Sequence, residues 1–177
     1  MNVENLRLVT PHVRYFQSFQ ESHDEWDGAF QDGAGIRASD DVTSLEGFSA
    51  WVDYLRACET KVQDPDFVTC TFKWIVDADN YVGSIALRHE LTPALLNLGG
   101  HIGYGVRPSY RGKGVASRAL RQTLQSARER GLARVLATCD EYNGASAAAL
   151  ERVGGVLEDA RQSDDGRWYR RYWFDLS

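Results

Sequence analysis

The sequence predicts an α/β fold in which a mixed central sheet of about seven strands is flanked by about four helices. Short runs rich in β-branched and aromatic residues alternate with stretches in which apolar residues recur at the helical period. One long helix also lies between two strand-like runs, as a crossover between parallel strands requires. The predicted order is β-α-α-β-β-β-α-β-α-β-β with no linker or repeat, so we expect a single domain over residues 1–177.

The N-terminal part is predicted to hold one strand and two helices. Residues 5–10 alternate sufficiently for a strand, and residues 12–26 place apolar side chains loosely along one helical face. A loop is expected over residues 28–41, which contain three glycines and show no apolar period. The second helix is expected to begin near Thr43 or Ser44, because either side chain can cap a helix N-terminus.

The middle of the chain is predicted to form an antiparallel hairpin. Residues 64–66 interrupt the pattern with a proline between two aspartates. Residues 67–76 and 81–87 are rich in β-branched and aromatic side chains, and residues 77–80 between them have the composition of a turn. Residues 91–99 are predicted to be a loop, because proline and glycine interrupt them.

A parallel pair of strands is predicted around the long helix. Residues 101–106 are expected to form the first strand of this pair. The helix that follows is expected to end at Gly131, because glycine readily adopts the left-handed conformation that terminates helices. Residues 135–139 are a short apolar run, so we expect a buried strand parallel to the first.

The C-terminal part is predicted to contain a short helix and a hairpin. The helix is expected over residues 146–153, and the hairpin strands over residues 156–161 and 167–174. Residues 163–166 end in Asp-Gly, the strongest hairpin signal in the chain. Residues 168–173 mix aromatic and cationic side chains as an RNA-binding surface would, but a strand with one buried face explains them more simply.

A glycine-rich joint, residues 106–116, connects the first parallel strand to the long helix. The first backbone N–H groups of a helix lack partners within it, and the positive end of the helix dipole lies there. Gly112 and Gly114 would let a ligand approach the backbone closely, while Arg111 and Lys113 add positive charge. A strand, a turn rich in N–H donors and a helix in this order predict a phosphate-binding site.

The joint matches neither of the two common nucleotide-binding patterns, the P-loop and the Rossmann fingerprint. Its Arg111-x-x-Gly114-x-Ala116 segment resembles the acyl-CoA pyrophosphate loop of the GNAT N-acetyltransferase superfamily, Arg/Gln-x-x-Gly-x-Gly/Ala. The order of elements resembles that family over nearly the whole chain, most strongly over residues 99–155. The resemblance implies the GNAT acyl-CoA N-acyltransferase fold, with acetyl-CoA as cosubstrate. The plainer alternative is a glycine-rich turn before an ordinary core helix.

The resemblance also implies which residues contact the cofactor. In the family the strand before the pyrophosphate loop diverges from the next strand, and the pantetheine arm enters the gap. Asn143 and Ser146 match a second family segment, whose asparagine contacts pantetheine, although Asn143 could equally be a turn residue and helix cap. The cofactor residues so expected are Val106, Arg107, Arg111, Gly112, Lys113, Gly114, Val115, Ala116, Ser117, Asn143 and Ser146.

Acetyl transfer to an amine needs a proton acceptor for the amine and a hydrogen-bond donor for the oxyanion. We expect the Val106 backbone N–H to be the oxyanion donor. His101 is the candidate general base, because it lies where many relatives have a glutamate and because histidine titrates near neutral pH. The alternative is a histidine hydrogen-bonded for structural reasons. The general acid stays unassigned, because Leu150 occupies the position at which many relatives have a tyrosine.

The acceptor side carries weaker signals. Trp26, His89, Glu90 and Tyr104 are candidate substrate-binding residues, and His89 and Glu90 are rivals of His101 as the base. An acidic run with a single arginine is either a solvated loop or a wall that attracts a cationic substrate. It consists of Glu21, Asp24, Glu25, Asp27, Asp32, Asp40, Asp41 and Glu46.

Composition indicates a soluble globular protein, with 43% hydrophobic and 25% charged residues. The net charge of −5 argues against general nucleic-acid binding. No signal peptide or membrane span is evident, so a cytoplasmic protein without a membrane partner is expected. The three cysteines suggest neither disulfides nor a metal site. A homodimer is possible, since relatives are often dimers.

The function expected is therefore acetyl-CoA-dependent N-acetylation of a primary amine on a small, cationic acceptor. Two alternatives stay open. One is acetylation of a protein lysine or N-terminus, which an open groove would favour over a closed pocket. The other is a degenerate, non-catalytic relative that binds CoA as a sensor, which the leucine at position 150 allows.

Overall fold

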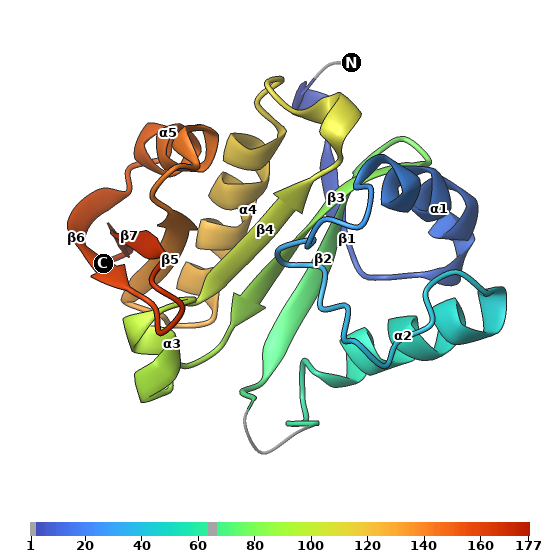
Figure 1. Ribbon diagram of the computed structural model, residues 1–177, viewed down its shortest axis with the longest axis horizontal. Helices are drawn as coiled ribbons and strands as arrows, with labels where there is room; N and C mark the ends of the chain where they lie inside the picture. The colour runs from blue at the N-terminus through green and yellow to red at the C-terminus, as the bar shows by residue number, and fades with distance from the viewer. Residues whose placement is uncertain (1–2, 64–66) are drawn as a thin grey trace.

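One seven-stranded mixed sheet organises the protein (Figure 1). The computed structural model describes residues 3–63 and 67–177, so the break expected at residues 64–66 lies outside the described part. The strands lie in the order β1-β2-β3-β4-β5-β7-β6. They are β1 (Arg7–Val9), β2 (Cys70–Asp77), β3 (Asn80–Arg88), β4 (Ile102–Val106), β5 (Arg134–Asp140), β6 (Val156–Gln162) and β7 (Trp168–Asp175).

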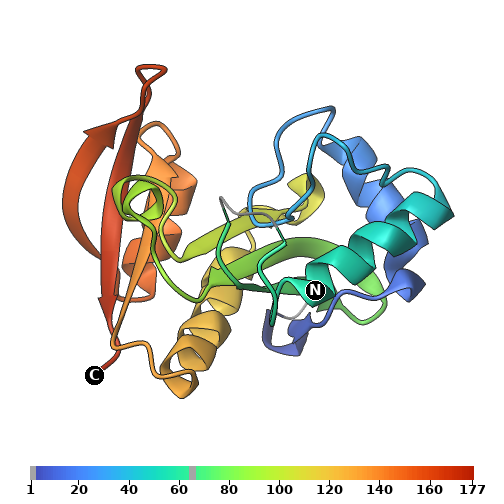
Figure 2. The ribbon, with the colours of Figure 1, turned by 90° about the horizontal axis from the view of Figure 1, so that it is seen from below.

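Two helices cover one face of the sheet, and two others cover the opposite face. The α-helices are α1 (Phe16–Glu25), α2 (Leu45–Ala57), α3 (Pro93–Asn97), α4 (Val115–Glu129) and α5 (Gly144–Arg152). Helices α4 and α5 share an aliphatic core with the strands, whereas α1 and α2 share an aromatic core with β2 and β3. Seen from below, α1 and α2 lie at one end of the molecule and β6, β7 and α5 at the other (Figure 2).

The aromatic core under α1 and α2 is centred on Phe19. Its ring lies 5.1 Å from the rings of Phe48 and Trp51 and 5.2 Å from the ring of Tyr81. Trp74 of β2 completes the cluster and is fully buried. Aromatic rings packed in this way bury large apolar areas and fix the orientation of the helices that carry them. The cluster therefore holds α1 and α2 rigidly against the sheet.

Local sequence signals explain most helix boundaries. The hydroxyl of Ser44 accepts the backbone N–H of Gly47 at 3.1 Å, so Ser44 caps α2 as one of the two expected residues. Gly131 follows α4 at φ +89° and ends it as predicted. The prediction of a plain loop over residues 91–99 is wrong. Thr92 caps the short helix α3 there, and Pro93 occupies its first turn, where a proline costs no hydrogen bond.

Strands β4 and β5 form the parallel pair that the sequence predicts. They pair at a single register position, Ile102 with Ala137, and the backbone N–H of His101 donates to Leu136 at 2.7 Å. Toward the C-terminal end of β4, no further pairing to β5 exists among the described residues. The sheet therefore opens between these two strands, beside the glycine-rich joint.

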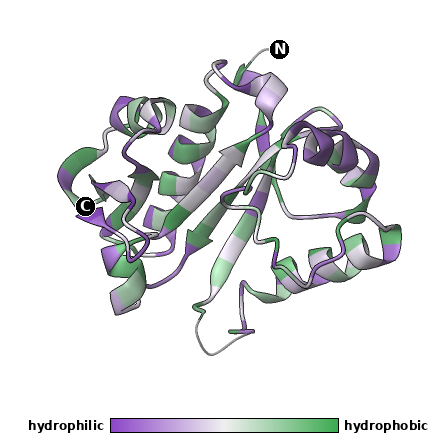
Figure 3. Cartoon of the chain, in the orientation of Figure 1, coloured by the Kyte–Doolittle hydropathy of each residue, from purple (hydrophilic) through white to green (hydrophobic). Residues whose placement is uncertain are grey.

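Hydropathy varies along every helix and none is uniformly apolar (Figure 3). Accordingly, no helix within residues 3–63 and 67–177 is long and apolar enough to cross a membrane. The helices instead present one apolar stripe to the sheet, as expected of an α/β domain with a covered sheet.

Candidate active site

The opening between β4 and β5 exposes the backbone of β4. In an antiparallel ladder, successive residues point their N–H and C=O groups to opposite sides of the strand. Arg107 donates its N–H to Val82 of β3 at 2.9 Å, whereas Val106 faces Gly83 as the next pair of the register. The N–H of Val106 therefore points away from β3 and into the opening. The sequence assigned this group to the oxyanion, and its direction suits that role.

The cradle, defined here as residues 111–117, turns from a short 3₁₀ segment (Pro108–Tyr110) into α4. Gly114 precedes the helix at φ +82°, a conformation that costs other residues energy, and no side chain caps α4. Six consecutive backbone N–H groups, from Gly112 to Ser117, donate no hydrogen bond to any described residue. Such a row of unpaired donors at the positive end of a helix dipole suits a diphosphate.

Two residues of the cradle have cationic side chains. The Arg111 Nε donates to the carbonyl oxygen of Val106 at 3.1 Å, and its guanidinium lies over the Trp26 ring at 4.6 Å from the ring centre. The Lys113 ammonium donates to the carbonyl oxygen of Ser109 at 2.7 Å. Arg111 thereby links the cradle to both β4 and the end of α1. Val115 and Ser117 are buried, so only their backbone can reach a ligand.

Arg107 and Glu25 connect α1 to the segment before the cradle. The Arg107 side chain donates to a Glu25 carboxylate oxygen at 2.7 Å and also lies near Glu21 at 3.7 Å. Glu25 accepts further hydrogen bonds from the N–H of Ser109 at 2.9 Å and from its hydroxyl at 3.0 Å. Sequence reasoning missed this role, because Glu25 stood out only as one member of the acidic run.

The ionisation of Glu25 reflects these partners. Burial raises the pKa of Glu25, but hydrogen bonds from Ser109 and Arg107 outweigh it, so the pKa lies below its usual value. The carboxylate is thus charged at neutral pH and holds Arg107 in place. Because the Arg107 side chain is occupied in this way, the backbone of Arg107 is the part that is available to a cofactor.

Asn143 and Ser146 lie across the opening from β4. The Asn143 side-chain oxygen accepts the backbone N–H of Ser146 at 3.0 Å and caps α5, so the capping alternative holds. The amide nitrogen of the same side chain donates to no described residue and can still contact a ligand. The Ser146 hydroxyl pairs with the Tyr104 hydroxyl at 2.6 Å, which ties α5 to β4. Burial raises the pKa of Tyr104 to about 12.

His101 is buried at the start of β4 and faces β5. Its Nδ1 accepts the backbone N–H of Leu136 at 2.9 Å, so a neutral ring carries its proton on Nε2. Burial and the nearby positive charge of Arg88 lower the pKa of His101 to about 4. A ring that already uses its only basic nitrogen cannot take a proton from an amine. The geometry therefore favours the structural role that the sequence left open.

The other candidate bases lie at the far end of β3. The two ring nitrogens of His89 contact the hydroxyls of Thr69 at 2.9 Å and Thr71 at 2.8 Å. Burial, followed by the charge of Arg130, lowers the pKa of His89. Glu90 is exposed beside it. Both residues follow the end of β3 that is remote from Val106, because the antiparallel register pairs Leu87 with Ile102.

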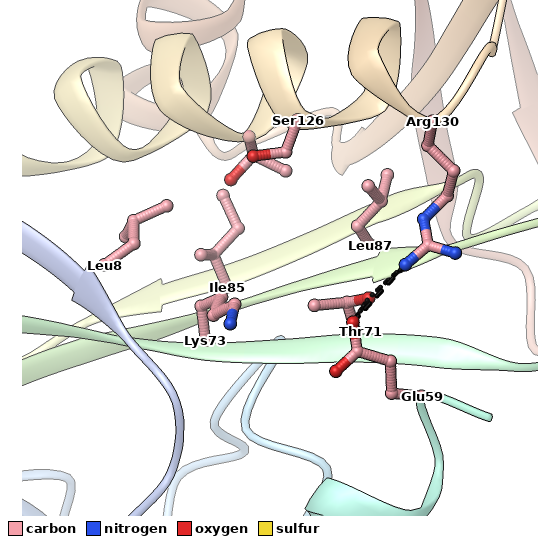
Figure 4. Close-up of a pocket in the computed structure, with 9 residues that line it drawn as sticks. Leu8, Glu59, Thr71, Lys73, Ile85, Leu87, Ser126 and Arg130 are labelled. Carbon is pink, nitrogen blue, oxygen red and sulfur yellow. Dashed lines mark hydrogen bonds and ion pairs between the residues drawn. The ribbon is translucent and has the colours of Figure 1, made fainter.

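A cavity of about 170 Å³ lies near His89, between α4 and the sheet (Figure 4). Arg130, which caps the C-terminus of α4, donates to the Thr71 hydroxyl at 3.2 Å and to Glu59 at 3.4 Å. Leu8, Ile85 and Leu87 lie among its lining residues. It shares no lining residue with the cradle or with the opening beside β4. The cavity is therefore separate from the candidate active site.

The loop between α1 and α2, residues 26–44, lies over β4. Gly33 packs so closely on Gly103 that a Cβ at position 33 would lie 2.3 Å from the Gly103 carbonyl oxygen. A Cβ at Gly105 would likewise lie 2.8 Å from the Asp32 carbonyl oxygen and 3.2 Å from the Trp26 ring. The glycines of β4 thus allow the loop to approach the strand directly. This loop therefore lies in direct contact with β4.

Leu150 occupies no position in this opening. It is fully buried in the aliphatic core beneath α5. The side chain that replaces the family's usual tyrosine therefore packs among apolar residues, where a phenol would need a hydrogen-bond partner. A proton donor to the leaving thiolate must come from elsewhere.

The model of the acetyltransferase (GNAT) domain family matches residues 15–156, which is well over half of the chain. The chain belongs to this family. The match covers the α1–α2 loop, the opening beside β4, the cradle and α5. No curated protein sequence matches the chain.

Solved structures support the fold. A microcin C7 self-immunity acetyltransferase, MccE, in complex with acetyl-CoA and AMP is 15% identical, with a TM-score of 0.72 over 97% of this chain and 93% of that one. RimL, a ribosomal L7/L12 α-N-protein acetyltransferase in complex with coenzyme A, is 18% identical, with a TM-score of 0.71 over 97% and 94%. The ribosomal-protein-S5-alanine acetyltransferase of Vibrio fischeri is 17% identical, with a TM-score of 0.68 over 97% and 92%.

The protein is thus an acetyl-CoA-dependent acetyltransferase of the GNAT type, with acetyl-CoA as cosubstrate. The seven-stranded mixed sheet and the GNAT fold predicted from the sequence are confirmed. The opening beside β4 and the unpaired N–H groups of the cradle fit such a carrier chemically. Among the described residues, no group of three or more His, Cys, Asp or Glu side chains could hold a metal ion.

Proposed function

We propose that this protein transfers the acetyl group of acetyl-CoA to a primary amine of a small, cationic acceptor. The observation that carries the proposal is the close packing of the α1–α2 loop on β4, at Gly33 and Gly103. A loop in backbone contact with the strand leaves no space for a polypeptide between the two at this point. A carboxylate on that loop suits a small ammonium compound better than a broad protein surface.

The backbone supplies two functions in this proposal. The N–H groups from Gly112 to Ser117 hold the diphosphate of the carrier, with Arg111 and Lys113 adding positive charge. The N–H of Val106 donates to the oxyanion that forms when an amine attacks the thioester carbonyl. Fixing both reactants beside one rigid strand lowers the entropic part of the barrier.

The proposal needs no side chain as general acid. Tyr104 is half-buried and its hydroxyl pairs with Ser146 of α5, but its pKa of about 12 makes it a poor proton donor to a thiolate. The Tyr142 side chain is 91% exposed to solvent. The nitrogen of the attacking amine carries a proton that must leave in any case, and it can pass to the thiolate sulfur.

A second candidate is N-terminal acetylation of a protein. Two of the similar structures, RimL and the Vibrio fischeri enzyme, are named as acetyltransferases of ribosomal proteins. Phe30, on the α1–α2 loop, is 78% exposed, and exposed aromatic side chains are common in protein contacts. This candidate shares the cofactor chemistry and differs only in the acceptor.

An acceptor screen tests both candidates. Purified protein is incubated with acetyl-CoA, and thiol release is followed with polyamines, aminoglycosides, amino acids and peptides that begin with serine or alanine. Turnover of a small cationic amine, with at least tenfold lower kcat/KM for every peptide, is the expected result. Preference for a peptide would support the second candidate. Binding of CoA without thiol release from any amine would indicate a non-catalytic sensor.

A further inference from the structure

Hydrogen bonds and ion pairs account for half of the acidic run between positions 21 and 46. Glu21 and Glu25 face Arg107, and Glu25 also accepts two hydrogen bonds from Ser109. Asp40 accepts hydrogen bonds from the Arg37 side chain and backbone. Asp41 accepts hydrogen bonds from the residues that begin α2. These four carboxylates thus pair with other residues of the protein.

The other four carboxylates, Asp32 among them, are all exposed to solvent. Asp24, Asp27 and Glu46 are exposed on α1, just after α1, and at the start of α2. Asp32 differs from them because its backbone lies directly against β4. Its carboxylate also accepts no hydrogen bond and forms no ion pair within 4.0 Å from any described residue. Asp32 is therefore the one carboxylate of the run that combines a place in the active site with an open hydrogen-bonding capacity.

The backbone of Asp32 is fixed over the middle of β4. Its carbonyl oxygen lies against Gly105, where a Cβ would be only 2.8 Å away, and it accepts the Ser84 hydroxyl at 3.5 Å. The next residue, Gly33, packs on Gly103. These contacts hold the backbone of Asp32 beside Gly105, the residue that precedes Val106. This is the part of β4 that borders the opening toward β5.

The charge environment of Asp32 suits a proton acceptor. The titratable groups that act on it come from the two strands beneath the loop, Arg88 of β3 and Tyr104 of β4. Solvent reaches the carboxylate, but the surrounding protein raises the pKa of Asp32, and the positive charge of Arg88 opposes this rise only in part. Arg88 itself donates to the carbonyl oxygens of Gly99 and Gly100 rather than to Asp32.

We propose that Asp32 is the general base of this enzyme and the residue that receives the protonated amine of the acceptor. The inference rests on the proposed function, and it gives to Asp32 the role that the sequence alone suggested for His101. The basic nitrogen of His101 is used by Leu136, whereas the carboxylate of Asp32 has no hydrogen-bond donor among the described residues. A single anionic group also explains a preference for acceptors that arrive as cations.

The proton and electron balance of the step is simple. The ammonium group of the acceptor gives one proton to Asp32, directly or through a water molecule, and the amine lone pair then attacks the thioester carbonyl. A C–N bond forms, and the carbonyl oxygen takes up negative charge beside the N–H of Val106. The C–S bond then breaks as the carbonyl re-forms, and one of the two protons still on nitrogen passes to the thiolate while the other stays on the amide product. Asp32 finally releases its proton to solvent.

Asp32→Asn tests the inference, with Asp27→Asn as a matched control on the same loop. Asp27 is exposed and adopts φ +47°, a conformation that asparagine tolerates well. With the best small amine of the acceptor screen, Asp32→Asn is expected to lower kcat about 100-fold at pH 7. Asp32→Glu, which keeps the carboxylate, should lose less. Titration calorimetry should give a CoA affinity within about twofold of the parent for all three variants.

The pH profile separates a base from a positioning residue. Once the pH exceeds the pKa of the acceptor amine, the amine enters without a proton and needs no base. The ratio of parent to Asp32→Asn activity is therefore expected to fall toward one as the pH approaches that value. A constant ratio over the whole range, or a change confined to the KM of the acceptor, would overturn the assignment of Asp32 as the base.

Two further outcomes are distinct. Equal activity of the Asp32→Asn and Asp27→Asn variants, with the parent active on a small amine, would overturn the role of Asp32 alone. A parent protein that binds CoA but acetylates no small amine would overturn the proposed function, and the role of Asp32 with it. The parent reaction, measured first, decides between these two failures.

Discussion

The two sides of the opening beside β4 are built from different groups. The cradle side presents backbone N–H groups from Gly112 to Ser117, whose directions follow from the turn into α4. The proposed acceptor side presents the side chains of a loop, and among its described acidic residues only Asp32 combines a carboxylate that accepts no hydrogen bond with a backbone that lies against β4. The cofactor side therefore depends on backbone conformation, whereas the acceptor side depends on which side chain occupies a few positions.

This difference explains why the two sides carry unequal information in the sequence. A backbone site needs glycines at particular positions, and such positions form a motif. A side-chain site on a loop needs only one residue brought to the right place by long-range packing. A substitution that strains the cradle backbone should therefore weaken binding of CoA, whereas removal of one carboxylate from the loop should lower turnover of the acceptor.

The largest effect is expected from Gly114→Val, with Gly131→Val as its control. Both glycines have similar positive φ, +82° and +89°, at opposite ends of α4, and a Cβ at either position would meet no described atom closer than 3.9 Å. Both variants should lose roughly 1–2 kcal/mol of stability from the left-handed backbone. CoA affinity, measured by calorimetry, should fall at least about 100-fold only in Gly114→Val. Equal affinities would contradict a backbone cradle.

A smaller effect on both binding and stability is expected from Glu25→Gln. The substitution weakens the bonds to Arg107 and Ser109, so the free energy of unfolding should fall by about 2 kcal/mol and the KM for acetyl-CoA should rise about tenfold. Asp24→Asn, exposed on the same helix, should change neither quantity.

The pH dependence of that stability difference follows from the sign of the shift. The pKa of folded Glu25 lies below its usual value, so the carboxylate stabilises the fold above the pKa of the unfolded chain, near 4.3. The advantage of the parent over Glu25→Gln should be complete above about pH 5 and should disappear as the pH falls through the folded pKa. Urea unfolding of both proteins at several pH values measures this difference in the free energy of unfolding. A difference that did not decrease as the pH falls would contradict an ionic anchor.

An effect on stability with little change in catalysis is expected at His101. Its pKa is about 4 in the fold and about 6.5 when unfolded, so the unfolded chain binds more protons between these values. Acidification from pH 6.5 to 4 should cost the parent up to about 3 kcal/mol through this group. His101→Gln should remove that share of the pH dependence, whereas exposed His12→Gln should not.

The kinetic result for His101→Gln separates the two interpretations of this residue. Loss of the acceptor for the Leu136 N–H should lower stability at every pH. If the variant, assayed below its melting temperature, also lost more than about 100-fold in kcat with the acid limb of the pH profile abolished, His101 would be the base after all.

The smallest effect is expected from Tyr104→Phe. The change removes the hydroxyl that pairs with Ser146 but leaves the ring in place. Turnover should stay within about fivefold of the parent, because one neutral hydrogen bond contributes about 1 kcal/mol. Tyr142→Phe, at an exposed tyrosine, serves as the control. A loss above about 100-fold for Tyr104→Phe would show that this hydroxyl protonates the thiolate.

Local signals in the sequence were sufficient for most of the fold. The turn between β2 and β3, the parallel pairing of β4 with β5, the end of α4 at Gly131 and the C-terminal hairpin all follow from short-range patterns and appear as predicted. The prediction of a plain loop failed at α3, where one capping threonine and one proline suffice for a five-residue helix. Such a short element has no apolar period to reveal it.

The site was predictable only where it follows from backbone conformation. The roles of Gly114 and Val106 were inferred from a motif and a strand, and they stay predictions; the N–H groups of both residues donate to no described residue, which is compatible with them. The partners of His101 and the separation of Asp32 from the other acidic residues depend on contacts between segments far apart in the chain. No single-sequence pattern reports which of the eight acidic residues lies against β4 with a carboxylate that accepts no hydrogen bond.

A structure of the complex with acetyl-CoA tests the central claim most directly. The account predicts diphosphate oxygens within about 3.2 Å of several N–H groups between Gly112 and Ser117. It also predicts the thioester carbonyl beside the N–H of Val106, with the Asp32 carboxylate facing the acetyl group. Density for the diphosphate away from α4, or a thioester on the far side of the α1–α2 loop, would contradict it.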